Sequence, residues 1–459
     1  MLKKRIFPVI PSLTLFWVAF LTASILAQPL LPAPVPRPAP REPGQKSIEE
    51  VWHELEMSTF KKPTFDELGT LHEGYSFEEL WEIARTNNPS IRLKSNMIAA
   101  ASGGRLQAGL YPNPTLTYGG DNLGVDGEAG KHGLAISQEI VTAKKKKLDR
   151  AVASYDVSAA RKEYSMECLK LQNDLKIAHY ELICALLVYK VEQFSQRIST
   201  GLLDAALTLQ KQGKVKTVDV LQFRTMLNSS QLTLKQAENN QRAAWQRLVS
   251  VLGTPELPYQ PVRGTVVDRT PPRDWQGTWL QFQQASPQLA LSRLKVEQAR
   301  VYLARQEAER ISNVSATFAL SQDIPADNTV PFVGISVPLK IYDKNQGNIA
   351  KAKAEVAVAA REAERVTLSL HKRLADVFRD YENAKELIEV YETSIIPDSF
   401  EALRQIGEIY RAGSVTYLEL YHQRQAVVTA LLQYINALKM RAVAATQIDG
   451  MLLEGTLDF

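Results

Sequence analysis

The chain has 459 residues, of which 45% are apolar and 23% are charged, and its formal net charge is +4. Loss of a leader containing Lys3, Lys4 and Arg5 would lower this charge by three. That argues against a nucleic-acid-binding protein, because phosphate recognition needs a cationic face. Two cysteines exclude a disulfide-rich scaffold, and six scattered histidines argue against a multi-histidine metal centre. No run of about 18 apolar residues follows residue 28, which excludes a helical membrane transporter.

The N-terminus has the parts of an export signal. A positive region, residues 3–5, precedes a mostly apolar run at 12–27, and Ala27 offers a small residue for cleavage. We predict a cleaved signal peptide at residues 1–27, because the run is short for a membrane span; an uncleaved anchor is the alternative. Residues 28–75 form a proline-rich and then polar segment, whose prolines favour a stiff polyproline II spacer.

The rest of the chain is an internal duplication, which divides it into residues 76–262 and 263–459. Each half has the order helix, strand, strand, long helix, turn, helix. The clearest matched positions are Gly213, Val215, Asp219 and Arg224 in the first half, and Gly413, Val415, Glu419 and Arg424 in the second. A chance match would not keep this order, so we predict a duplicated fold that is mainly α with a small β part.

Long helices dominate both halves. Residues 151–200 contain neither Gly nor Pro, and their apolar residues alternate spacings of four and three, which is typical of helices packed side by side. We predict one helix from about 148 to 212 and a second from 349 to 411, with a kink at Pro397. Helices returning from the two turns are expected to end at Gly253 and near Leu452. A soluble coiled-coil protein remains an alternative from this pattern alone.

Two pairs of strands are predicted, one pair in each half. Apolar residues alternate with small or polar residues in 115–118, 134–140, 314–321 and 333–340, and polar turns lie at 119–131 and 321–331. One apolar and one polar face suit the wall of a membrane barrel, whereas a soluble sheet that caps the bundle is the alternative. Four strands are too few for a barrel that one chain could close, since single-chain barrels begin at about eight strands. If these strands span a membrane, several chains must share one barrel.

These features resemble the TolC-like outer-membrane efflux channel family over about residues 76–453. The Pro-Asn-Pro at 112–114 and the Asp-Lys-Asn-Gln-Gly-Asn at 343–348 are most similar to the CzcC-type, heavy-metal efflux branch. The other segments that carry the resemblance are AGLYPNPTL at 108–116, ISQEIVTAKKKKL at 136–148, GKVKTVDVL at 213–221, GISVPLKIYDKNQGNIA at 334–350 and GSVTYLELY at 413–421.

The resemblance implies a homotrimer. Its long antiparallel helices would form a periplasmic tunnel, and four strands from each chain would build a shared transmembrane β-barrel in outer-membrane lipid. It also implies docking to a periplasmic adaptor and to an inner-membrane pump, often of the resistance-nodulation-division type. The channel itself would be passive, without a cofactor.

The resemblance further places Asp219 and Glu419 at the periplasmic entrance of the tunnel. In a trimer they would form an acidic ring that favours cations, although acids are also stabilised at helix starts by the dipole. His422 follows Glu419 by three residues and is a candidate for a gate contact or pH sensitivity, with an exposed polar role as the alternative.

The tip turns provide the remaining candidate residues. Gly213 and Gly413 are expected to permit tight turns, with Val215 and Val415 beside them, and the resemblance makes these tips the adaptor-docking surface. The lysines at 144–147 are candidates for contact with lipid headgroups, and Cys168 is expected to fill core volume.

No catalytic constellation and no metal site can be recognised, so the protein is not expected to be an enzyme. The leading hypothesis is an exit channel for heavy-metal or other cations. Alternatives are the same channel for drugs, organic compounds or type I protein export, or a soluble periplasmic tether.

Overall fold

The computed structural model describes residues 69–125, 130–267, 273–411 and 414–457. The predicted signal peptide, most of the segment 28–75, and Gly413 therefore lie outside the described residues. All described elements belong to the compact unit formed by residues 53–459. They are β1 Thr70–Leu71, α3 Phe77–Asn87, α4 Pro89–Gly109, β2 Thr115–Asp121, β3 Lys131–Ile140, α5 Lys145–Lys211, α6 Thr217–Leu252, β4 Gly264–Thr265, α7 Trp275–Ala285, α8 Pro287–Ala308, β5 Val314–Asp323, β6 Asn328–Ser336, α9 Gln346–Val390, η2 Tyr391–Ile395, α10 Ile396–Arg411 and α11 Tyr417–Asp449.

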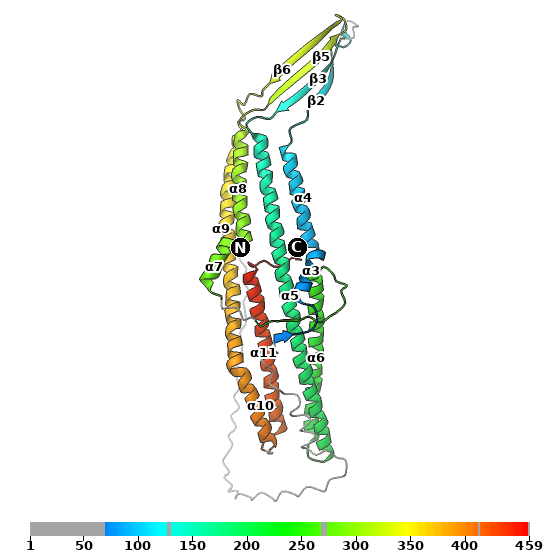
Figure 1. The fold of residues 1–459 in the computed structure, drawn as a ribbon, viewed down its shortest axis with the longest axis vertical. Coiled ribbons are helices and arrows are strands. Elements are labelled where there is room, and N and C mark those ends of the chain that lie inside the picture. The colour runs from blue at the N-terminus through cyan, green and yellow to red at the C-terminus, as the bar shows by residue number, and fades with distance from the viewer. Residues whose placement is uncertain (1–68, 126–129, 268–272, 412–413, 458–459) are drawn as a thin grey trace, which may run out of the picture. The chain divides into compact units, whose positions relative to one another are not determined.

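Within this unit, long helices lie side by side, and a four-stranded sheet lies beyond the ends of α4, α5, α8 and α9 (Figure 1). The predicted order of elements is confirmed in both halves, and the fold is mainly helical as expected. Helix α5 has 67 residues and therefore spans about 100 Å at 1.5 Å per residue. It begins three residues before and ends one residue before the predicted bounds.

The second long helix is interrupted, as the proline at 397 led us to expect, but the interruption has another form. A π-helical turn, η2, occupies Tyr391–Ile395, and Pro397 is the second residue of the helix that follows. Proline lacks a backbone N–H, and its ring clashes with the carbonyl four residues earlier. The wider turn accommodates that mismatch just before the proline.

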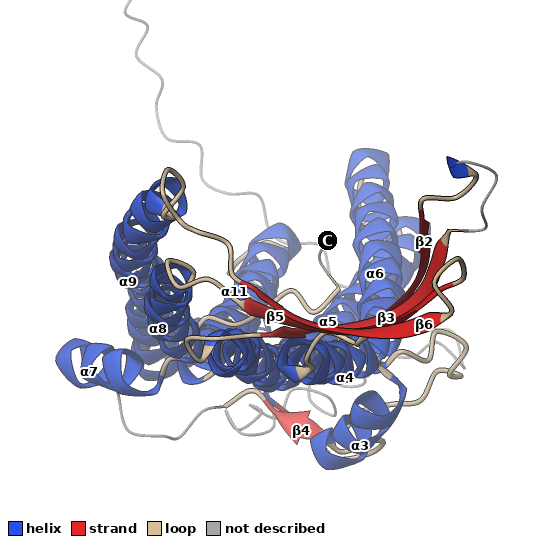
Figure 2. Cartoon of the chain, turned by 90° about the horizontal axis from the view of Figure 1, so that it is seen from above, coloured by secondary structure: helices blue, strands red, loops and turns tan. Residues whose placement is uncertain are grey.

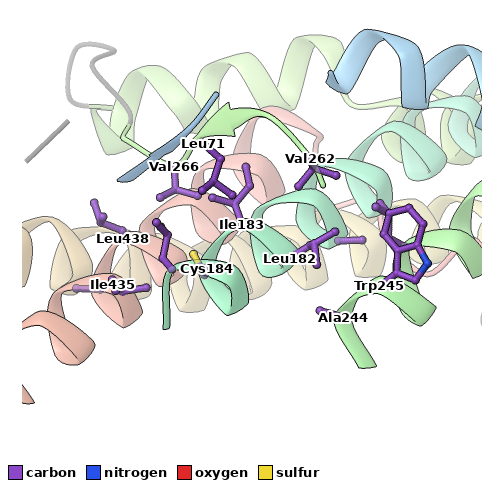
Figure 3. Packing of buried hydrophobic residues seen from close by; sticks show 14 of the residues in the cluster. Leu71, Leu182, Ile183, Cys184, Ala244, Trp245, Val262, Val266, Ile435 and Leu438 are labelled. Atoms are coloured by element: carbon purple, nitrogen blue, oxygen red, sulfur yellow. The ribbon is translucent and has the colours of Figure 1, made fainter. Parts of the chain in front are cut away.

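The main apolar core joins α5, α6 and α11 to the segments around β1 and β4. Figure 3 shows Leu182 and Cys184 of α5 among the buried side chains, with Trp245 of α6 and Leu438 of α11 in the same cluster. Leu431, Leu438 and Ala445 lie seven residues apart on α11 and are all buried, as is Leu452 just beyond the helix. On α5, Cys168 is partly buried and packs against this core, and Cys184 is the more deeply buried cysteine.

Corresponding caps start α4 and α8. Asn88 precedes Pro89, and Ser286 precedes Pro287, so each helix has a polar cap followed by proline at its first position. Asn88 is buried; its side chain accepts from the Ser90 N–H at 2.9 Å and donates to the Val251 carbonyl at 2.9 Å. This bond fixes the start of α4 against the end of α6, where Gly253 adopts φ +74°.

The sheet has the order β2-β3-β5-β6, and all neighbouring strands are antiparallel. The strand predicted at 333–340 is shifted in the structure, because β6 runs from Asn328 to Ser336 and the turn before it is shorter than expected. Pro331 lies within β6, which has one neighbouring strand in the sheet, and proline within a sheet is found mainly in such edge strands. Beyond Ser336 apolar and polar residues still alternate, but this segment is not paired with a neighbouring strand.

Candidate functional site

The sheet has two chemically different faces. The register places Leu116 opposite Ile136, Ile136 opposite Phe318, and Phe318 opposite Val333, so these four side chains share one face. Most large apolar residues of that face are exposed, Ile335 to 76%, and Val314 is half-buried. The exposed members of this apolar face are Leu116, Tyr118, Leu134, Ile136, Ile140, Phe318, Leu320, Val333 and Ile335.

The opposite face carries mostly small and polar side chains, among them Thr117, Ser137 and Thr317. The Thr317 hydroxyl donates to the Ser137 hydroxyl at 3.2 Å. Val330 and Phe332 are large exceptions. A Cβ added at Gly334 would lie 2.7 Å from the Phe332 ring, so the glycine leaves room for that ring. Among the described strands, β2 and β6 each have only one neighbour in the sheet, which leaves two backbone edges open.

A polar network joins the sheet to the helices where the two repeats meet. Lys145, the first residue of α5, is only 1% exposed, and its Nζ donates to Asn313 Oδ1 at 2.8 Å and to Glu309 Oε1 at 3.3 Å. Asn313 in turn donates to Glu139 Oε1 at 2.7 Å. Burial raises the pKa of Glu309, but bonds from Arg305 and the charge of Lys145 outweigh it and hold that pKa below its usual range.

This network corrects the expectation that the lysines at 144–147 contact lipid headgroups together. Lys145 lies inside the protein, whereas Lys144 and Lys147 are exposed. No local signal indicates the network, because Lys145 lies 164 residues from Glu309 and 168 from Asn313. Lysine is almost never buried without a partner, so its burial follows from those distant partners.

In the second repeat, Asn345 occupies the position that Lys144 occupies in the first, directly before the long helix. Lys144 and Asn345 both precede their long helices in the left-handed conformation, at φ 56° and 61°. Asn345 is buried and donates to the Gln306 carbonyl at 2.8 Å. Asparagine adopts positive φ more readily than most residues, which explains why the Asp-Lys-Asn-Gln-Gly-Asn motif turns the chain here.

The turn between α5 and α6 forms the first tip. Gly213 adopts φ +69°; its N–H donates to the Gln210 carbonyl at 2.9 Å, and the Lys214 N–H donates to the Leu209 carbonyl at 3.0 Å. This is the glycine helix ending expected from sequence. The second tip repeats one of these bonds, from the Ser414 N–H to the Ile409 carbonyl at 3.2 Å. Gly413 itself lies outside the described residues.

Valines lie beside both tip turns. Val215 is partly buried against a small apolar cluster formed by Leu202, Ala206, Val220 and Phe223. Val415, at the second tip, is half-buried. Adaptor docking at these turns stays a prediction.

Asp219 and Glu419 occupy equivalent positions, three residues after the caps of α6 and α11. Asp219 accepts from the Lys216 N–H at 3.2 Å, and Glu419 accepts from the Thr416 N–H at 2.6 Å. Bonds from the backbone and hydroxyl of Thr416 lower the pKa of Glu419, so it carries its charge at neutral pH. Each acid therefore caps its helix locally, and the acidic ring stays a prediction.

The two tips also touch. Tyr421 of α11 packs against the cluster of Leu202 and Phe223 at the first tip. His422 is exposed, and its ring lies 5.9 Å from that of Tyr421 at an interplanar angle of 66°. These contacts bring all the described candidate residues of the entrance to the same end of the helices, opposite the sheet (Figure 1).

Neither cysteine has the surroundings of a reactive or metal-binding thiol. Burial raises the pKa of Cys184 to about 12, and it also raises the pKa of Cys168. Among the described residues, no group of three or more His, Cys, Asp or Glu side chains could hold a metal ion. No helix within the described ranges is long and apolar enough to cross a membrane.

Residues 279–452 match the model of the family described as outer membrane efflux protein. The chain is also similar to the cobalt-zinc-cadmium resistance protein CzcC of Cupriavidus metallidurans. The two are 20% identical over 384 residues, which cover 82% of this chain and 90% of that protein. This match agrees with the resemblance to the CzcC-type branch that the turn motifs indicate.

Solved structures of outer-membrane channels have the same fold. The channel OprN superimposes with a TM-score of 0.70 at 18% identity, covering 83% of this chain and 90% of that one. CusC superimposes with a TM-score of 0.67 at 14% identity, covering 86% and 99%. The matched family consists of passive channels and not of enzymes. Residues 279–452 thus match the outer membrane efflux protein family, and the chain has the fold of these outer-membrane channels.

Proposed function

We propose that this protein is the passive outer-membrane exit channel of a tripartite efflux system and that it exports heavy-metal cations. In this proposal three copies close one transmembrane barrel and one periplasmic tunnel. The observation that carries it is the sheet, whose apolar face is exposed and whose two edges are open. Inside lipid both edges need hydrogen-bond partners, and a single four-stranded sheet cannot supply them.

Strand directions are compatible with closure between copies. Neighbouring strands alternate in direction from β2 through β6, so β2 and β6 run in opposite directions. Placing β6 of one copy beside β2 of the next therefore continues the antiparallel pattern around a ring. The apolar face would then contact lipid, and the face with Thr117, Ser137 and Thr317 would line the lumen.

The entrance residues support a preference for cations. Asp219 and Glu419 lie at equivalent tip positions, and in a trimer they would contribute up to six carboxylates to the narrow end of the tunnel. Such a ring attracts cations and repels anions. The likeness to a cobalt-zinc-cadmium resistance protein supports a metal cargo, and export of organic compounds or of a polypeptide is the competing outcome.

The proposal includes the rest of the assembly. The signal peptide at 1–27 would direct the chain to the outer membrane, and residues 76–262 and 263–459 would act as the two repeats. The tips around Gly213, Val215, Gly413 and Val415 would dock a periplasmic adaptor, which links the channel to an inner-membrane pump of the resistance-nodulation-division type.

Two measurements test the proposal. The membrane fraction should retain the protein after a carbonate wash, and the detergent-extracted particle should have the mass of three chains. A protein that washes off as a monomer would support a soluble tether instead. In planar bilayers, the double variant Asp219→Asn/Glu419→Gln should lose cation preference, with Lys147→Gln as an exposed control away from the tips. An unchanged ratio of cation to anion permeability would contradict the proposed role of the acidic ring.

A further inference from the structure

A pocket far from both the sheet and the tips opens between the start of α3, β4 and the middle of α5. We call it the α3–β4 pocket, and its lining includes His72, Phe77, Lys176, His179, Tyr180 and Arg263. Its volume is about 480 Å³, which is within the range of small-molecule sites. Figure 2 shows α3 and β4 on the side toward which the sheet is convex. A sheet that closes a barrel is concave toward the lumen, so the pocket lies on the outer side of the proposed tunnel.

The pocket also lies about halfway along the longest helix. At a rise of about 1.5 Å per residue, His179 is about 50 Å from the start of α5 at Lys145, next to the sheet. In the proposed channel the sheet crosses the outer membrane and the tips face the inner membrane. The middle of α5 is then at the height of the periplasm that contains the peptidoglycan layer.

His179 supplies this pocket with a hydrogen-bond acceptor. The residue is 4% exposed, and its Nε2 lies 3.2 Å from the Arg263 carbonyl, which can only accept, so Nε2 carries the proton. Burial lowers the pKa of His179 more than the Arg263 carbonyl and Glu78 raise it, so the ring is neutral at pH 7. Nδ1 therefore presents a lone pair, and it has no hydrogen-bond partner among the described residues. A ligand hydroxyl or amide N–H can donate to it.

Two cations beside His179 keep donors for a ligand. The Lys176 Nζ lies 5.8 Å from the centroid of the Phe77 ring, and no carboxylate of the described chain lies within salt-bridge distance of it. The Arg263 guanidinium is 3.6 Å from the Glu79 carboxylate, longer than a hydrogen bond, and its side chain is half exposed. Both groups can donate to a ligand carboxylate, and such charge-assisted bonds are stronger than neutral ones.

The rest of the lining suits a sugar ring. Phe77 and Tyr180 are partly buried and add aromatic surface, on which the C–H groups of a sugar can pack. Glu78 also lines the pocket; bonds from its own N–H and from Ser76 lower its pKa, so it is an ionised acceptor at neutral pH. A carboxylate alone would not use these acceptors. A hydroxylated ring that carries a carboxylate uses the donors and the acceptors together.

We infer that the α3–β4 pocket binds an acidic amino sugar of the peptidoglycan and so attaches the outside of the tunnel to the cell wall. Lys176 and Arg263 bind the carboxylate of the sugar. His179 Nδ1 and Glu78 accept from its hydroxyl and amide groups, and its ring packs on Phe77. This inference rests on the proposed outer-membrane channel, which carries α5 through the wall.

Binding to purified sacculi tests the inference with the full-length protein in detergent. The protein should pellet with the sacculi, and soluble N-acetylmuramic acid should release it. N-acetylglucosamine lacks the carboxylate and should need at least about tenfold more sugar for the same release, the loss expected for one charge-assisted hydrogen bond. Equal release by the two sugars would overturn the inference without any variant.

Matched variants separate the pocket from general attraction to an anionic polymer. Lys176→Gln/Arg263→Gln should weaken retention on sacculi at least about tenfold. Lys162→Gln/Lys190→Gln removes the same charge from exposed positions of α5 and should leave retention at the parent level. Circular dichroism checks that both double variants keep the helical fold. Equal retention of the two folded variants would contradict the inference.

The mass and the membrane fraction of the same preparation distinguish a failure of this inference from a failure of the channel. A membrane-retained trimer that does not bind sacculi contradicts the inference and leaves the channel standing. A monomer that washes off the membrane contradicts the channel, even if it binds the sugar. Calorimetric binding of N-acetylmuramic acid without retention on sacculi would support the sugar chemistry, assign it to soluble wall fragments and overturn the attachment to the wall.

Discussion

The helical bundle and the four-stranded sheet place the same kinds of side chain in opposite surroundings. Leu182 and Leu438 are fully buried in the bundle, whereas Val333 and Ile335 are each 76% exposed in the sheet. The bundle therefore completes its core with one chain, and the sheet does not. A monomer rarely leaves so continuous an apolar surface open, which indicates that the sheet is finished by something outside the chain.

The largest effect is expected from emptying the bundle core. Leu438→Ala should lower the free energy of unfolding by about 2–5 kcal/mol, because the removed side chain leaves a cavity among packed helices. Ile335→Ala should have a smaller effect, since its own chain covers little of that side chain. Thermal unfolding of the detergent-extracted protein, followed by loss of helical circular dichroism, measures both. Equal losses would contradict the contrast between the two regions.

A charge on the apolar face of the sheet should affect assembly rather than the bundle. Ile335→Arg should reduce the outer-membrane fraction, because a midplane arginine facing lipid costs about 2–4 kcal/mol per chain. Thr317→Arg, on the opposite face of the neighbouring strand, is the control and should assemble. Quantitative immunoblotting of membrane fractions provides the measurement. Normal assembly of the Ile335 variant would show that this face does not contact lipid.

The network between the two regions should have an intermediate effect. Lys145→Met keeps a similar side-chain length but removes the buried ammonium, which leaves Asn313 Oδ1 with the Thr142 N–H and Glu309 with Arg305 as donors. Loss of these two bonds should cost about 1–3 kcal/mol. Lys147→Met removes an exposed lysine of the same helix turn and should be nearly neutral. The two unfolding midpoints, measured in the same detergent, should separate clearly. Matching midpoints would mean that the network adds no net stability.

The smallest effect is expected at the second tip and depends on pH. The pKa of Glu419 is lowered in the folded protein. Its contribution to folding stability is therefore present above the ordinary carboxyl pKa and is lost as the pH falls through the pKa of the folded state. Glu419→Gln can still accept from the Thr416 N–H but cannot titrate. Its unfolding temperature should therefore fall less between about pH 5 and pH 3 than that of the parent.

Much of the fold could be predicted from the sequence because the relevant signals are local. A stretch free of Gly and Pro located α5 to within three residues at either end, and the repeated tip glycine marked the turn at Gly213. The bounds of β6 were less accurate, since the alternation continues through residues that lack ladder partners. The π-helical turn before Pro397 was also missed, because several local geometries can accommodate a proline.

The candidate site was predictable only in part. The tip acids could be found because they recur at matched positions of the two repeats, yet their capping bonds required the positions of Lys216 and Thr416 in the structure. Cys184 lies in the core and Cys168 nearer its margin, a difference that the heptad pattern did not indicate. Helix periodicity specifies a face, but neighbouring helices decide how much of that face is covered.

The amino-acid sequence alone determined the duplicated order of elements, the long helices and the two-faced strands, because side-chain spacing along a segment sets its faces. Tertiary structure decided which helices pack on one another, the strand order β2-β3-β5-β6 and the burial of Lys145. Those features depend on contacts or alignments between segments far apart in the chain, and no local pattern encodes which distant segments become neighbours.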